Sequence, residues 1–70
     1  MKVLYDPISR MFTLEVDEDN SVFEGTLTHI MSVLRTKYKL NPALAREVCT
    51  KAIADIGAPV DVDVIRRYIP

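Results

Sequence analysis

The alternation of apolar and polar residues near the N-terminus predicts a β-hairpin. Successive side chains of a strand point to opposite faces of the sheet. One face of the strand predicted over residues 10–16 is apolar and carries Phe12, Leu14 and Val16. Residues 2–5 supply the first strand, and Pro7 suits the second position of a type I turn between them. Because an isolated hairpin is only marginally stable in water, its apolar face requires a covering helix.

The next segment shows helical spacing. Ser21 followed three residues later by Glu24 matches a capping box, in which the two side chains satisfy the first backbone amides of a helix. We therefore expect a helix over residues 22–38. Its apolar residues fall within an arc of about 100° and form one stripe: Phe23, Leu27, Ile30, Met31, Leu34 and Tyr38.

A second helix begins with Asn41 as N-cap and Pro42 at the first helical position. Gly57 suits a C-cap, and Pro59 prevents the helix from continuing. The short link to the preceding helix predicts a helical hairpin. The apolar stripe of this helix contains several small residues: Ala45, Val48, Cys49, Ala52, Ile53 and Ile56.

The C-terminal segment has two readings. Residues 60–64 alternate valine and aspartate, as a strand does, but residues 65–69 break that alternation. As a helix capped by Asp61, the segment gathers its apolar residues on one side. We favour a short C-terminal helix.

These elements predict an α+β fold in which an N-terminal β-hairpin packs on a helical hairpin and a short C-terminal helix (ββααα). Residues 1–70 are expected to form a single small domain. The predicted core follows the apolar stripes: Val3, Tyr5, Phe12, Leu14, Val16, Phe23, Leu27, Ile30, Leu34, Tyr38, Val48, Ala52, Ile56, Ile65 and Ile69.

Composition excludes several classes of protein. Among 70 residues, 49% are hydrophobic and 27% are charged, which is ordinary for a globular protein. No apolar run approaches the ~20 residues of a membrane-spanning helix. A single cysteine allows no internal disulfide and favours a reducing, cytoplasmic setting. The net charge of −1 gives no general attraction to nucleic acid, although residues 1–24 sum to −4 and residues 25–70 to +3.

The candidate chemical groups do not form a catalytic or metal site. Cys49 lies on the predicted core stripe and His29 on the outer face of its helix, so they are not expected to meet. Asp17, Asp19 and Ser21 have the spacing that opens an EF-hand loop, but the sixth position is Val rather than Gly and the twelfth is Thr rather than Glu. We expect no enzyme activity, no catalytic residue, no cofactor and no metal site.

A weakly charged helix face suggests how the protein acts. Gly25, His29, Ser32 and Thr36 lie opposite the apolar stripe of the first predicted helix, where lysine and glutamate are usual. Small uncharged faces allow close approach of another chain. We therefore expect a non-enzymatic protein-interaction module, such as an adaptor, inhibitor or accessory regulatory protein. Its partner is another protein or a second copy, which would form a homodimer.

The alternative is a small DNA-binding transcriptional regulator. Residues 51–69, KAIADIGAPVDVDVIRRYI, resemble a helix-turn-helix, with Gly57 as the turn glycine. Together with the helix that precedes them, they extend the resemblance over residues 42–69. It implies nucleic-acid contacts from basic and aromatic residues: Arg46, Lys51, Arg66, Arg67 and Tyr68. Asp61 and Asp63 would repel phosphates at the start of the reading helix, where base contacts are made, so this function ranks second.

Overall fold

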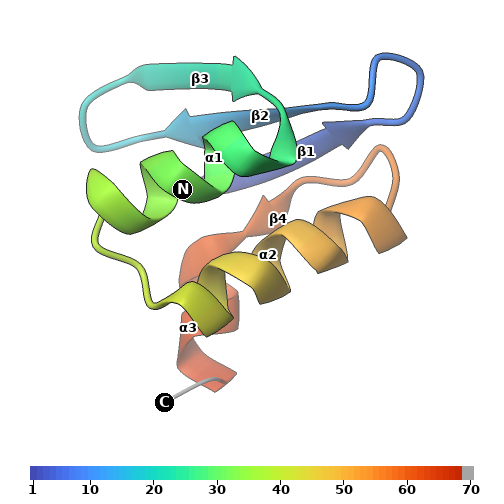
Figure 1. The fold of residues 1–70 in the computed structure, drawn as a ribbon. Helices are drawn as coiled ribbons and strands as arrows, with labels where there is room; N and C mark the ends of the chain where they lie inside the picture. Colours follow the sequence, from blue (N-terminus) through green and yellow to red (C-terminus); the bar gives the residue numbers. More distant parts are fainter. Residues whose placement is uncertain (69–70) are drawn as a thin grey trace.

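Four antiparallel strands form one sheet in the order β3-β2-β1-β4, with two helices against one face (Figure 1). The computed structural model describes residues 1–68, except for the side chain of Tyr68. Its elements are β1 (Lys2–Asp6), β2 (Met11–Val16), β3 (Ser21–Gly25), α1 (Leu27–Thr36), α2 (Pro42–Ala54), β4 (Val60–Asp61) and α3 (Val62–Tyr68). The predicted α+β class is confirmed. The structure adds the unpredicted strand β3 and shows that the strand reading of residues 60–64 holds for β4.

Two turns of the same length join the first three strands. Asp6 pairs with Met11 and Val16 pairs with Ser21, so four residues form each turn. The last residue of each turn has a left-handed backbone, with φ of 59° at Arg10 and 57° at Asn20. The predicted hairpin is thus confirmed, and it continues into a three-stranded meander.

The capping box predicted at Ser21 is wrong, because residues 21–25 form the edge strand β3. This strand pairs with β2 along its length, and Phe23 lies opposite Leu14. This pairing gives hydrogen-bond partners to backbone N–H and C=O groups of β2, which a helix over residues 21–25 could not supply. Helix α1 begins only at Leu27, where the Thr26 hydroxyl oxygen accepts a hydrogen bond from the amide of His29 at 3.4 Å.

Helix α2 begins as predicted. The side-chain oxygen of Asn41 accepts a hydrogen bond from the amide of Ala43 at 2.7 Å, and Pro42 occupies the first turn. The helix ends at Ala54 rather than at the predicted glycine. Gly57 lies three residues later with φ of 86°, in the loop that turns the chain back towards the sheet.

Both readings of the C-terminal segment are correct in part. Val60 and Asp61 form β4, which pairs with Val3 and Lys2 of β1. Helix α3 follows at once, and a carboxylate oxygen of Asp61 accepts a hydrogen bond from the amide of Asp63 at 2.9 Å. The predicted helix capped by Asp61 is therefore confirmed over Val62–Tyr68.

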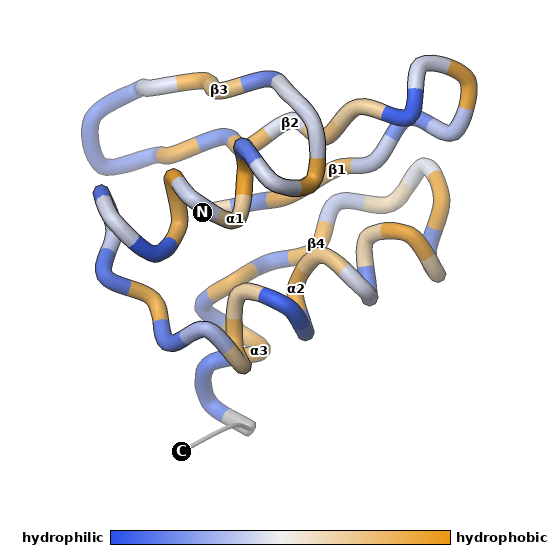
Figure 2. Tube along the Cα trace, viewed as in Figure 1, coloured by the Kyte–Doolittle hydropathy of each residue, from blue (hydrophilic) through white to orange (hydrophobic). Residues whose placement is uncertain are grey.

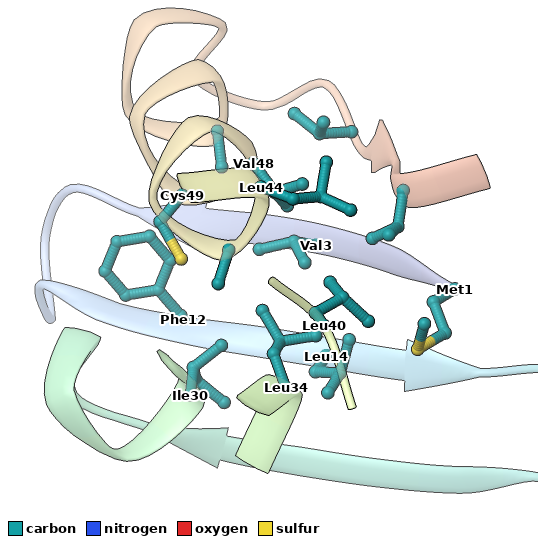
Figure 3. Packing of buried hydrophobic residues seen from close by; sticks show 14 of the residues in the cluster. Met1, Val3, Phe12, Leu14, Ile30, Leu34, Leu40, Leu44, Val48 and Cys49 are labelled. Carbon is teal, nitrogen blue, oxygen red and sulfur yellow. The ribbon is translucent and has the colours of Figure 1, made fainter. Parts of the chain in front are cut away.

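The core lies between the sheet and the two long helices. Helix α1 contacts β2 and β3, while α2 contacts β1 and β4. Figure 3 shows Ile30 and Leu34 beside Leu14, and Val48 and Leu44 on the side of Val3. The apolar stretches of the chain meet in this layer (Figure 2).

Most of the predicted core residues are buried, and two are not. The nine buried ones are Val3, Phe12, Leu14, Val16, Ile30, Leu34, Val48, Ala52 and Ile65. Three aromatic residues are partly buried against them: Tyr5, Phe23 and Tyr38. Leu27 and Ile56 are exposed, which corrects the prediction. Leu27 lines a hollow beside α2, and Ile56 lies beyond the end of α2 at Ala54. Ile69 lies outside the described residues.

Other buried residues were absent from the predicted core. They include Met1, Leu40, Leu44, Val60 and Val62. The last two enter the core because β4 extends the sheet beside β1. No helix in residues 1–68 is both long enough and apolar enough to cross a membrane.

Candidate functional site

Cys49 and His29 occupy different environments. Cys49 is buried on α2, where Figure 3 shows its sulfur beside the ring of Phe12, and burial raises the pKa of its thiol to about 11. His29 is exposed at the start of α1, with its ring against the backbone of Gly25. A buried thiol with a raised pKa is a poor nucleophile.

The acidic turn between β2 and β3 is organised by its own hydrogen bonds. One carboxylate oxygen of Asp19 accepts from the amide of Ser21 at 3.0 Å, and the other accepts from the hydroxyl of Tyr38 at 3.2 Å. The hydrogen bond from the Ser21 side chain is the main cause that lowers the pKa of Asp19. Within residues 1–68, no group of three or more His, Cys, Asp or Glu side chains is placed to hold a metal ion.

The residues of the predicted contact face do not all lie on one helix. Gly25 belongs to β3 and is buried, so its placement on the outer face of a helix is wrong. A Cβ atom at this glycine would lie 2.6 Å from Cδ2 of His29, which explains why a residue without a side chain fits there. Ser32 and Thr36 are exposed on α1, and both line a hollow beside α2.

That hollow is one part of a groove along the outer seam between α1 and α2. It has a volume of about 600 Å³, and Ser32, Thr36 and Pro42 are among its lining residues. A second hollow of about 330 Å³ is lined by Leu27, Ile53 and others. The two adjoin because Met31 lines both. We call this surface the α1–α2 groove.

One end of the α1–α2 groove is apolar. Leu27 is 41% exposed and Ile53 is 43% exposed, and both line the smaller hollow together with the partly buried Met31. Leu27 and Ile53 were predicted from helical spacing to face inward. They line instead one hollow to which both α1 and α2 contribute. Large exposed apolar residues that share one hollow are a more informative signal than single ones scattered over a surface.

The charges of the α1–α2 groove have a single sign. Arg35 lines the larger hollow and Arg46 lines the smaller one, whereas no carboxylate lines either. Within residues 1–68, the one ion pair closer than 4 Å joins the N-terminal amino group to Asp63 at 3.5 Å. Both arginines are exposed. The groove therefore combines an apolar seam with guanidinium groups available for a partner.

The candidate nucleic-acid residues are spread over two helices. Arg46 and Lys51 lie on α2, while Arg66 and Arg67 are exposed on α3. The side chain of Tyr68 lies outside what the structure describes. Seven residues separate α2 from α3 and include β4, so the predicted helix-turn-helix connection, which uses a turn of three or four residues, is wrong.

Arg66 lines a third hollow at the start of α2, which adjoins the larger hollow of the α1–α2 groove because Leu40 lines both. Its volume is about 590 Å³, and Lys39 and Asn41 are among its other lining residues. This hollow is more polar than the apolar end of the α1–α2 groove.

The sequence predicts two of the residues that line the α1–α2 groove, Ser32 and Thr36, but neither its apolar end nor its positive charge. The lack of charge at Ser32 and Thr36 indicates a contact face, but Leu27 is in the predicted core, and Met31 and Ile53 are on the predicted apolar stripes. The sequence pattern does not single out Arg35. A signal was present, because the apolar stripes of the two predicted helices include more residues than the apolar face of the predicted two-stranded hairpin. Comparison with protein-family models, with curated proteins and with solved structures finds no match for this chain.

Proposed function

We propose that this protein is a non-enzymatic protein-interaction module that acts through the α1–α2 groove, as an adaptor, inhibitor or accessory regulatory protein. The observation that carries the proposal is the partly exposed apolar cluster of Leu27, Met31 and Ile53 within one hollow. Apolar surface of this kind gains about 25 cal/mol for each Å² that a partner removes from water.

The composition of the groove supports this function. Methionine and arginine are enriched at protein interfaces relative to the rest of protein surfaces, and Met31 and Arg35 line the groove together. The small side chains of Ser32 and Thr36 leave room for close approach of another chain. We further propose a cytoplasmic setting, which agrees with Cys49 being a free buried thiol.

The experiment is affinity capture from the native host with two matched variants. Ser32→Arg places a long charged side chain in the groove, whereas Ser9→Arg makes the same change in the exposed turn between β1 and β2. We expect proteins that are enriched by the wild type to be lost with Ser32→Arg and retained with Ser9→Arg. Equal capture by both variants would reject the groove as the interaction surface.

Self-association is the second form of the same proposal. Light scattering at high protein concentration distinguishes a homodimer from a single chain. A mass twice that of one chain, reduced by Ser32→Arg but not by Ser9→Arg, would assign the groove to a second copy.

DNA binding is the alternative proposal, supported by the exposed Arg66 and Arg67 on α3. Asp63 precedes them on the same short helix and weakens their attraction for phosphate. A gel-shift titration at low and high salt tests this function. DNA binding requires an affinity that falls steeply with salt, whereas an apolar protein contact changes little.

A further inference from the structure

We infer that the α1–α2 groove binds a short acidic amphipathic helix of a partner protein, with apolar side chains on the seam and carboxylates on Arg35 and Arg46. The inference rests on the proposed function, and it adds the chemical class of the partner. It follows from the distribution of charge and apolar surface within the groove.

The charge of the groove selects an acidic occupant. Arg35 and Arg46 line its two hollows, and no aspartate or glutamate lines either one. A guanidinium group binds a carboxylate through two parallel hydrogen bonds, which gives both attraction and orientation. Neither arginine has a carboxylate within 4 Å among residues 1–68.

The shape of the groove selects a short helix. Leu27 and Arg35 are eight residues apart on α1, which corresponds to about 12 Å along the helix axis. Two turns of a docked helix have nearly the same length. An amphipathic helix presents apolar residues three or four positions apart to such a groove. Its apolar side chains would cover Leu27, Met31 and Ile53. One carboxylate would lie beside them at Arg46, which lines the same hollow, and another would lie about two turns from Leu27 at Arg35.

Two other occupants fit less well. A second copy docked groove to groove would bring the arginines of both chains into one interface, where like charges repel. A nucleic acid would place phosphates on an apolar seam with only two arginines to neutralise them. An acidic helix satisfies the seam and the arginines together.

The test uses two designed helical peptides of the same length with leucine at every third and fourth position. They differ only in carrying glutamate or lysine at the flanking positions. Fluorescence anisotropy gives the affinities at low salt, and amide chemical shifts locate the binding surface. We expect the glutamate peptide to bind at least about tenfold more tightly than the lysine peptide, with shifts on α1 and α2.

Charge reversal supplies the decisive control. The double variant Arg35→Glu/Arg46→Glu should reverse the preference and bind the lysine peptide more tightly. The matched variant Arg10→Glu/Arg67→Glu changes two exposed arginines that line none of these hollows and should leave both affinities unchanged. All four positions are exposed, and circular dichroism of each variant checks that it folds.

The outcomes separate this inference from the proposed function. Equal affinity for the two peptides, no measurable binding of either, or shifts confined to α3 would overturn the acidic helix as occupant. If Ser32→Arg still abolishes host capture in that case, the interaction module stands with a different partner. If a short DNA duplex binds and shifts α3 while neither peptide binds, both proposals fail in favour of nucleic-acid recognition.

Discussion

The hydroxyl of Tyr38 donates a hydrogen bond to a carboxylate oxygen of Asp19 at 3.2 Å and so joins the end of the first helix to the β2–β3 turn. The ring of Tyr38 also packs edge-to-face on Phe23, with 6.2 Å between ring centres. Nearby, the ammonium group of Lys37 lies 5.0 Å from the centre of the Phe23 ring. The hydrogen bond between Asp19 and Tyr38 therefore links the β2–β3 turn to the segment that follows α1.

Removing the Tyr38 hydroxyl should raise the pKa of Asp19. The hydrogen bond from the Ser21 side chain is the largest cause that lowers this pKa, and the bond from Tyr38 contributes less. Tyr38→Phe should therefore raise the pKa of Asp19 slightly, and Ser21→Ala should raise it more. A carbon-13 NMR titration of the aspartate carboxyl groups measures both changes.

The pH dependence of stability has a definite sign. Because the folded-state pKa of Asp19 lies below its ordinary value of 3.8, its stabilisation is present above that pH and is lost as the pH falls through the folded pKa. Tyr38→Phe should reduce this acid-side loss. A larger effect of Tyr38→Phe than of Ser21→Ala would contradict the assigned order of the two hydrogen bonds.

Thr26, rather than Ser21, should stabilise the start of the first helix. Its side-chain oxygen accepts the hydrogen bond from the His29 amide. Replacing an N-cap threonine by alanine typically lowers the free energy of unfolding by about 1 kcal/mol. We expect that loss for Thr26→Ala in urea unfolding, and little change for Thr26→Asp, which keeps a capping oxygen. Equal losses for both variants would show that Thr26 does not act as a cap.

The misplaced helix start shows why the strands were only partly predictable. Phe23 and Leu27 are four residues apart and fit one helical face, but Phe23 lies on a strand and Leu27 on a helix. A short apolar segment satisfies either period, and pairing with a neighbouring strand decides between them. The alternation over residues 60–64 does not show that only Val60 and Asp61 form a strand, because their partner β1 lies almost 60 residues away in the sequence. Helix α2 was predictable because Asn41 and Pro42 mark its start locally.

The left-handed turn residues offer a way to stabilise the protein. Arg10 and Asn20 end equivalent turns with φ of 59° and 57°. A left-handed backbone costs a residue with a long side chain about 1 kcal/mol, whereas glycine and asparagine adopt it readily. Arg10→Gly should therefore raise the free energy of unfolding by up to about 1 kcal/mol. Asn20→Gly is the matched control and should change it little, as measured by thermal or urea unfolding.

Leu34→Ala should lower the free energy of unfolding much more than Leu27→Ala, although both leucines lie on the predicted apolar stripe. Leu34 is fully buried, and Leu27 is 41% exposed in the groove. A buried leucine replaced by alanine loses about 3 kcal/mol, since a cavity remains, whereas an exposed one loses less than about 1 kcal/mol. Urea unfolding of Leu34→Ala and Leu27→Ala measures the difference.

The expected stability of a chain of this length is about 4–10 kcal/mol, so Leu34→Ala removes a large part of it. If that variant does not fold, Ile30→Val provides the buried comparison with a loss of about 1 kcal/mol. A loss for Leu27→Ala equal to that of the buried variant would contradict the open groove.

The same contrast explains how far the candidate site could be predicted. Helical spacing gives the apolar stripe of each helix, but it does not give the width of the sheet that covers the stripe. Leu27 was therefore predicted as a core residue and Ile53 was placed on an apolar stripe, but both are exposed. The arginines carry no local signal either, because the spacing of Arg35 and Arg46 in the sequence does not show that they line one groove.

The Cys49 thiol should make stability fall at alkaline pH. Burial raises its pKa from an ordinary value of 9.0 to about 11. Between those values the unfolded thiol loses its proton while the folded thiol keeps it, so the free energy of unfolding decreases as the pH rises through this window. Below pH 9 the full stabilisation is present. The variant Cys49→Ala lacks this group, and its difference in stability from the wild type should shrink between pH 9 and 11 in urea unfolding.

Alkylation by iodoacetamide at pH 8 gives a second measurement of how well Cys49 is buried. The reagent should alkylate the folded wild type far more slowly than the urea-unfolded chain. Rapid alkylation of the folded chain would show that Cys49 is accessible from the groove that it lines.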